Sequence, residues 1–276
     1  MTLILLLFVP LVAGALMFIP GAWPRRALLP ITAAVHTVLS VIVLNAVRAG
    51  KPLSALGGML KPDALGVVFL VLASILFLAA SFYAVGYLKE EDKKHIKRDI
   101  QKGQIFTNAP ETRFLSCLCF FVAAMTLVTT TPNLGALWVG IELTTLASAP
   151  LIYFHRHQSS MEATWKYLMI CSVGIGLALI GNILMSVAFH GSGVDLHGMD
   201  QLSGFIAAAS EMKGSDSTLW LKAAFIFLLV GYGTKMGLAP LHTWLPDAHS
   251  QAPSMVSGML SGALLNCALL GILLHA

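Results

Sequence analysis

Eight long, nearly uninterrupted apolar segments follow one another along this chain, and they restrict its fold more than any other feature. A helix of about 20 apolar residues crosses the ~30 Å hydrocarbon layer of a bilayer, whereas an open sheet cannot satisfy its backbone hydrogen bonds in lipid. The sequence therefore predicts an all-α, polytopic integral membrane bundle of about eight transmembrane helices, without a soluble domain. The predicted helices cover residues 2–20, 27–47, 64–88, 113–131, 134–154, 163–189, 219–239 and 254–275.

The composition agrees with a membrane protein and excludes some functions. Charged residues make up 11% of the 276 residues, compared with roughly 25% in a soluble domain. The net charge is only +4 and the basic residues are not gathered into one face, so we expect the lipid bilayer and no nucleic acid as a partner. The four cysteines lie in apolar runs, and their spacing predicts neither a disulfide nor a metal site.

Basic residues are unevenly divided between the loops, which predicts the orientation. The loops after the first, third and fifth predicted helices carry 11 Lys and Arg residues, and the loops on the other side carry 5. Cytoplasmic loops are the richer in Lys and Arg, so we expect the N-terminus outside a bacterial or archaeal cell (inner) membrane. The charged loop 89–113 is interpreted as a solvated connector, with a docking surface for a partner subunit as the alternative. A short helix is predicted at 199–212.

Two ionisable residues lie well inside predicted helices. Glu142 is in the fifth helix and Lys235 in the seventh. A charge at the centre of a membrane helix costs about 2.5–3.5 kcal/mol on insertion scales, so each residue needs a partner or a wet path. A lysine holds its proton more tightly beside a carboxylate than without one. The two residues are therefore predicted to form a Glu–Lys pair that moves protons; the alternative is a structural ion pair.

The seventh helix is predicted to break just after Lys235. Gly237 and Pro240 follow the lysine, and proline disrupts a helix by removing a backbone donor. Broken helices in transporters form ion sites. The polar residues at this predicted interface are candidates for proton access or relay, with an interfacial polar cap as the alternative: His242, Asp247 and His249.

Other polar and small residues in the helices have simpler interpretations. Glu162 and Lys166 are spaced for an i,i+4 pair, although Lys166 is also a candidate for the proton path. His36 is interpreted as a hydrogen-bonded core histidine. Three glycines of the sixth helix are predicted to allow close helix packing rather than nucleotide binding, because no strand precedes them: Gly174, Gly176 and Gly181.

Three stretches carry a resemblance to a known family. They are "LWVGIELTTLASAPLIYF", "MEATWKYLMICSVGIGLALIGN" and, above all, "GTKMGLAPLHTWLPDAHSQAPSMVSGMLSGALLN". They resemble the antiporter-like membrane subunits of respiratory complex I, Mrp-type Na⁺/H⁺ antiporters and group 4 membrane-bound hydrogenases. Within that superfamily, the chain is most similar to the hydrogenase-4 or formate hydrogenlyase component F type.

The resemblance implies a fold and a function. Members of this superfamily contain two inverted five-helix repeats, so residues 1–112 are expected to form an N-terminal three-helix segment with a charged loop. Residues 113–276 are expected to form the first repeat. Glu142 and Lys235 match the family's proton-translocating pair. The resemblance further implies membrane partner subunits, a peripheral redox arm that drives proton movement, and no flavin, quinone, nickel or iron–sulfur cofactor in this subunit.

The chain also departs from the family pattern. Several relatives carry an ionisable residue on the eighth helix, where this sequence has Ser261 and Asn266. The second repeat is missing from these 276 residues, so we expect a truncated product, a fragment or one part of a split subunit. Two alternatives to a proton-translocating subunit stay open: a non-pumping structural membrane anchor, and an Mrp-type subunit that exchanges Na⁺ for H⁺.

Overall fold

The computed structural model describes the chain except for residues 52, 93–96, 99–104, 191–216 and 275–276, and in the described part it is almost entirely helical. The predicted all-α membrane bundle is confirmed. The predicted helix at 199–212 lies outside the described residues. The long helices are α1 (Thr2–Leu16), α2 (Ala22–Arg48), α3 (Ala64–Asp92), α4 (Glu111–Thr130), α5 (Leu134–Ile152), α6 (Gln158–His190) and α8 (Ser217–Met236).

The remaining elements are short or follow the break after α8. Residues 254–273 form one apolar span built from α10 (Ser254–Met259), a π-helical turn η3 (Leu260–Leu264) and α11 (Leu265–Leu273). The π-helical turn was not predicted from the sequence. The other short elements are the 3₁₀ turn η1 (Leu56–Gly58), the two-residue strands β1 (Lys97–Arg98) and β2 (Ile105–Phe106), which pair antiparallel, and α9 (Trp244–Gln251).

Seven of the described helical segments are long and apolar enough to cross a membrane. The first predicted helix is the exception, because α1 ends at Leu16 instead of residue 20 and has only 15 residues. Pro20 and Gly21 separate it from α2, and Gly21 has a φ of 111° that favours glycine. The first helix is therefore four residues shorter at its C-terminal end than predicted.

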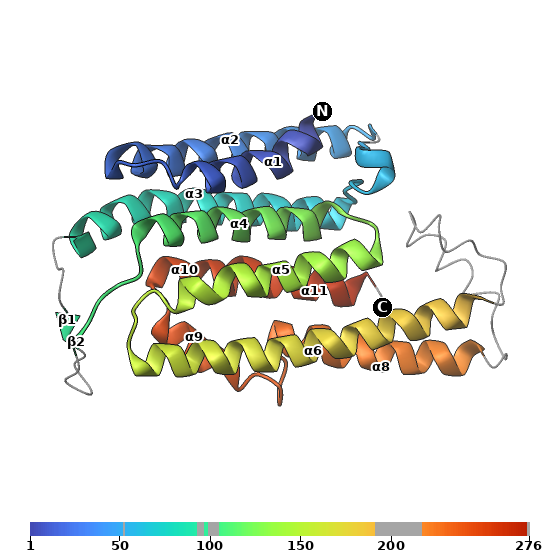
Figure 1. Ribbon diagram of the computed structural model, residues 1–276. Helices are drawn as coiled ribbons and strands as arrows, with labels where there is room; N and C mark the ends of the chain where they lie inside the picture. The colour runs from blue at the N-terminus through green and yellow to red at the C-terminus, as the bar shows by residue number, and fades with distance from the viewer. Residues whose placement is uncertain (52, 93–96, 99–104, 191–216, 275–276) are drawn as a thin grey trace.

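The helices lie side by side in successive layers, as Figure 1 shows. The helices α1 and α2 form one outer layer, α3 and α4 the next, α5 with α10 and α11 a third, and α6 with α8 the opposite outer layer. Helix α4 is the central element: 72% of its apolar stretch is buried inside the protein, against 33% for α2 and for α6. The outer helices therefore present apolar side chains outward, such as Val38, Val173 and Ile226, as lipid contact requires.

Small residues let α6 and α8 approach closely. A Cβ atom added to Gly231 of α8 would lie 2.6 Å from the backbone nitrogen of Ala178 on α6. A Cβ atom on Gly181 would lie 2.7 Å from the Leu228 side chain, and one on Gly174 would lie 2.7 Å from Thr234. The predicted packing role of Gly174 and Gly181 is thus confirmed, but that of Gly176 is wrong, because its Cβ position faces open space. Close packing by small residues is the usual basis of helix association in membranes.

Substitution of Gly231 by alanine should destabilise the protein. The new methyl group meets backbone atoms of α6, which cannot move aside as a flexible side chain can, and overpacking of this kind costs about 1–3 kcal/mol. Gly176→Ala is the matched control, because it adds the same methyl group to open space and improves helix propensity. Thermal unfolding in detergent measures both variants, and equal midpoints would contradict the packing interpretation.

Candidate functional site

The seventh predicted helix breaks where the sequence indicates. Helix α8 ends at Met236, and Gly237 follows with a φ of +81° that favours glycine. The indole nitrogen of the buried Trp244 donates to the backbone oxygen of Thr234 at 2.9 Å. This bond satisfies a carbonyl near the end of α8, which lipid could not do. In Figure 1 the chain leaves α8 part-way along α6, and α9 then lies beside the first part of α6.

Lys235 is completely buried next to this break. Its side chain is 0% exposed. The ammonium nitrogen Nζ donates to Thr145 Oγ1 at 2.8 Å and to Tyr167 Oη at 2.6 Å, and it lies 4.5 Å from the centre of the Tyr167 ring. A cation over an aromatic face is attracted by the ring quadrupole. Hydroxyl groups and a π-face therefore take the place of water around this cation.

The hydrogen bonds of Lys235 continue along α5. Tyr167 Oη lies 2.7 Å from Ser148 Oγ, and Ser148 Oγ donates to the backbone oxygen of Thr144 at 2.7 Å. A hydroxyl has one proton to donate. When Tyr167 accepts from the ammonium, its own proton is directed to Ser148, and the proton of Ser148 to the carbonyl. The result is a directed chain of hydrogen bonds that runs from Lys235 to the backbone of α5.

Glu142 lies one helical turn from this chain and does not touch the lysine. Its Oε1 accepts from Ser172 Oγ of α6 at 3.1 Å, and its Oε2 is buried without a hydrogen-bond partner among the described residues. No ion pair within 4.0 Å joins Glu142 to Lys235, both of which the structure describes. The predicted pair is therefore open in this structure, and its role stays a prediction.

Sequence reasoning missed the hydroxyl groups of the site. Glu142, Thr145 and Ser148 are three residues apart on α5, a spacing that brings side chains to one face of a helix. That polar stripe was the available signal. Tyr167 gave no comparable signal, because a tyrosine in an apolar helix is usually a core residue. Its role depends on the packing of α6 against α5 and α8.

Two buried thiols lie on helices that pack against α8. They are Cys171 of α6 and Cys267 of α11. Helix α11 packs closely on α8, since a Cβ atom on Gly271 of α11 would lie 3.3 Å from the Tyr232 ring of α8. The two residues singled out on the eighth helix do not reach the lysine: Ser261 donates to carbonyl oxygens of Ser257 and Gly258, and Asn266 to that of Gly262.

The predicted access residues are distributed over α9 and its neighbours. Lys166 Nζ lies 2.8 Å from Glu162 Oε1, which confirms the predicted i,i+4 pair, and 2.9 Å from Asp247 Oδ2. The charged triad thereby joins α9 to α6. Its groups are about half exposed, so solvent screens these ion pairs and we expect them to position α9 more than to stabilise the fold. Lys166 is the residue next to Tyr167, which binds Lys235.

The two histidines differ in their surroundings. His249 is half-buried, and its Nδ1 lies 2.7 Å from Ser257 Oγ of α10, so it ties α9 to the following span. Burial lowers the pKa of His249 from its ordinary value of 6.5. His242 is exposed in the loop between α8 and α9. The structure therefore brings Asp247 and His249 into contacts and leaves the His242 side chain on the surface.

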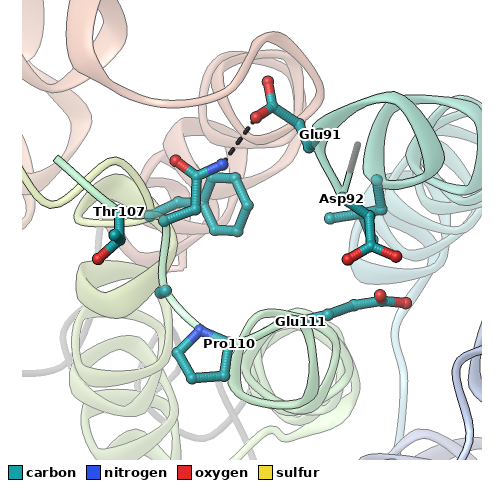
Figure 2. A pocket seen from close by; sticks show the side chains of 9 residues that line it. Glu91, Asp92, Thr107, Pro110 and Glu111 are labelled. Carbon is teal, nitrogen blue, oxygen red and sulfur yellow. Dashed lines mark hydrogen bonds between the residues drawn. The ribbon is translucent and has the colours of Figure 1, made fainter. Parts of the chain in front are cut away.

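A separate polar pocket of about 280 Å³ lies where α3 and α4 approach each other at the ends near β1 and β2. Asn108 Nδ2 donates to Glu91 Oε2 at 2.7 Å. Figure 2 shows Glu91 on one side of the pocket and the carboxylates of Asp92 and Glu111 on another. The guanidinium of Arg26 bridges the latter two, at 2.7 Å from Glu111 Oε2 and 3.3 Å from Asp92 Oδ2. Through Asp92 and Glu111, the guanidinium of Arg26 joins α2 to α3 and α4.

Comparisons with known proteins agree with this architecture. The family described as NADH:quinone oxidoreductase/Mrp antiporter, transmembrane region, matches residues 131–276. A hydrogenase-4 component F homolog from Methylacidiphilum infernorum is 36% identical over 219 residues, which is 79% of this chain and 43% of that protein. NADH-quinone oxidoreductase subunit N from Halorhodospira halophila is 28% identical over 243 residues, 87% of this chain and 44% of that protein.

A solved structure gives the same fold. A chain of the membrane-bound sulfane sulfur reductase, an archaeal respiratory membrane complex, superposes with a TM-score of 0.77 at 20% identity, over 99% of this chain and 40% of that chain. The family match and this fold define a class of polytopic, antiporter-like membrane subunits. This chain belongs to the NADH:quinone oxidoreductase/Mrp antiporter transmembrane family, as its sequence resemblance implied. It spans less than half the length of the two relatives.

Removal of the Tyr167 hydroxyl should weaken the Lys235 site. Tyr167→Phe keeps the ring and its contact with the cation but removes one of the two hydrogen bonds of Nζ, and a bond to a charged group contributes about 1.5–3 kcal/mol. Tyr153→Phe, at the end of α5, is the matched control. We expect a lower unfolding midpoint for Tyr167→Phe alone. Equal midpoints would show that Tyr167 does not hold the ammonium.

The protein should lose stability in acid through the contact of His249 on α9 with Ser257 on α10. Because the folded pKa of His249 is lowered, the folded state binds a proton less readily than the unfolded state. Stability is therefore complete above the ordinary pKa of about 6.5 and falls as the pH decreases below it. His249→Gln should flatten this dependence between pH 5 and 8, whereas His242→Gln, at an exposed position, should keep the wild-type slope. Unfolding midpoints over that range measure it, and parallel curves for all three proteins would contradict the assignment.

Proposed function

We propose that this chain is a proton-translocating membrane subunit of a redox-driven complex, either a group 4 hydrogenase or an NADH dehydrogenase-like complex. Family membership supports the coarse class, and the buried Lys235 supports the mechanism. The subunit performs no redox chemistry of its own. Partner membrane subunits and a peripheral redox arm supply the driving reaction and contain the redox cofactors.

The environment of Lys235 is the observation on which the mechanism rests. An ammonium group removed from water needs hydrogen-bond partners, and here they are the neutral hydroxyls of Thr145 and Tyr167 instead of a carboxylate. Hydroxyls can accept from the charged lysine and donate to the neutral one. Both protonation states of Lys235 therefore find partners in the same pocket. A purely structural ion pair would place the carboxylate against the lysine, in contrast to the open arrangement.

Movement of Glu142 would then control the proton on Lys235. In the open state, Glu142 is bonded to Ser172 and the lysine is surrounded by hydroxyls. If the side chain of Glu142 reorients along α5 toward Lys235, the nearby carboxylate favours the charged lysine. If the side chain reorients away, release of the proton from the lysine is favoured. Partner subunits would bias this equilibrium. The broken backbone from Gly237 to Pro240, together with Asp247 and His249, is the proposed route by which water reaches the lysine.

The proposed setting follows from the charge distribution and the family. The face that holds β1, β2 and the loop between α5 and α6 is the more basic, so we place it in the cytoplasm and the N-terminus outside the cell (inner) membrane. The transported ion is the proton. Sodium exchange, as in an Mrp-type subunit, and a non-pumping membrane anchor are the competing functions.

The assembled complex tests this function. Glu142→Gln and Lys235→Ala should each reduce redox-driven proton translocation in proteoliposomes at least about tenfold, while redox turnover with artificial acceptors persists. Lys222→Ala is the matched control, since it removes an exposed lysine from the same helix. Proton translocation is measured with a pH-sensitive dye in the vesicle lumen.

Other outcomes identify the competing functions. Normal pumping by both Glu142→Gln and Lys235→Ala would contradict the Glu–Lys mechanism. Sodium-dependent counter-transport without the redox partners would support the Mrp-type function. Assembly of the complex around this chain with no pumping even in the wild type would support an anchor.

A further inference from the structure

A second buried titratable residue lies outside the Lys235 site, in the N-terminal helices. His36 is midway along α2, and its side chain is 0% exposed. Nδ1 lies 3.0 Å from Ser74 Oγ of α3, and Nε2 lies 2.9 Å from Thr126 Oγ1 of α4. The ring also meets Phe77 edge-on at 6.3 Å. The prediction of a hydrogen-bonded core histidine is therefore confirmed, but the hydrogen bonds have a further consequence.

The hydroxyl partners of His36 are each shared with a backbone carbonyl. Ser74 Oγ lies 2.7 Å from the oxygen of Leu70, and Thr126 Oγ1 lies 2.8 Å from the oxygen of Val122. Each hydroxyl has one proton, and a neutral imidazole has one N–H and one bare nitrogen. The cluster therefore contains three protons for four short contacts. One contact must always lack a proton unless the ring becomes charged.

The missing proton can be placed in two nearly equivalent ways. With Nδ1 protonated, the ring donates to Ser74, Ser74 donates to Leu70, and Thr126 turns from its carbonyl to donate to Nε2. With Nε2 protonated, the ring donates to Thr126, and Ser74 turns to donate to Nδ1. In one tautomer the hydroxyl on α3 accepts the ring N–H, and in the other the hydroxyl on α4 accepts it. No heavy atom has to move between the two. The imidazolium would satisfy all four contacts at once.

The charged residues of the described helices around His36 are remote from the cluster along the chain. On the three helices around His36 the charged side chains stand near the helix ends, ten or more residues from His36, Ser74 or Thr126 along each helix. Helix α1, which packs against α2 and α4, carries no titratable side chain. The titratable groups of these and the adjoining elements are Arg25, Arg26, Arg48, Asp63, Tyr83, Tyr87, Lys89, Glu90, Glu91, Asp92, Glu111, Arg113, Cys117, Cys119, Glu142 and Cys267.

We propose that His36 is a second proton-exchange site of this chain, with Ser74 and Thr126 as its two partners. Water that reaches the cluster gives a proton to the bare nitrogen, and the opposite nitrogen then loses its proton to water. One proton is taken up and one released, and the ring ends as the other tautomer. The inference does not depend on the Glu142–Lys235 mechanism. Ionisable residues inside membrane helices are rare and are a default candidate for a functional site, which agrees with this assignment.

Nitrogen-15 NMR tests the proposal on the full chain in lipid bilayers. Protein labelled with ¹⁵N-histidine shows which ring nitrogens carry protons, and subtraction of the His36→Gln spectrum assigns the His36 signals among the nine histidines. We expect both tautomers in the wild type. Ser74→Ala should leave only the Nε2–H form, because Thr126 is then the remaining acceptor. Thr126→Val should leave only the Nδ1–H form.

The controls separate proton exchange from a structural role. Thr126→Ser keeps the hydroxyl and should keep both tautomers, which also shows that a loss in Thr126→Val comes from the hydroxyl rather than from misfolding. In D₂O, the His36 N–H should exchange much faster than the buried backbone amides of α4. A single wild-type tautomer that is unchanged in both variants, or an N–H as protected as those amides, would overturn the proposal. Pumping plays no part in these measurements, so their failure is independent of the proposed function.

Discussion

The cost of placing one ammonium group in lipid organises the second half of this protein. Lys235 is fully buried in this structure, and α5 and α6 bring hydroxyls within 2.8 Å of its ammonium group. For Tyr167 to reach the lysine, α6 and α8 must approach closely, and small residues such as Gly231 make that approach. The break after α8 is compatible with lipid because Trp244 bonds the carbonyl of Thr234. Close packing, helix break and polar chain thus meet around the same buried lysine.

The first half follows the same rule with a weaker polar group. Both ring nitrogens of His36 have a hydroxyl partner, one from α3 and one from α4. Both sites show how this fold satisfies polar groups in the membrane: serine, threonine and tyrosine hydroxyls bond to the buried group on one side and to each other or a backbone carbonyl on the other. Such groups accept or donate as the protonation state requires.

Much of the fold could be predicted from the sequence. The length and continuity of the apolar segments predicted the bundle, and Gly237 with Pro240 predicted the break to within a residue. The failures have local causes: Pro20 and Gly21 shorten the first helix, and Gly176 faces open space on an outer helix. The candidate residues Glu142 and Lys235 were recognisable because a charge in an apolar run is conspicuous, whereas Tyr167 and Cys267 were not, since neither departs from an ordinary membrane helix.

The sequence by itself determined that this chain is a helical membrane protein with two misplaced charges and a broken span, because hydropathy and backbone chemistry act locally along the chain. Only the tertiary structure decided which groups meet those charges. It placed Lys235 against hydroxyls and Glu142 against Ser172, and it gathered His36, Ser74 and Thr126 from three helices. Such contacts depend on the rotation and spacing of packed helices, and no single segment contains that information.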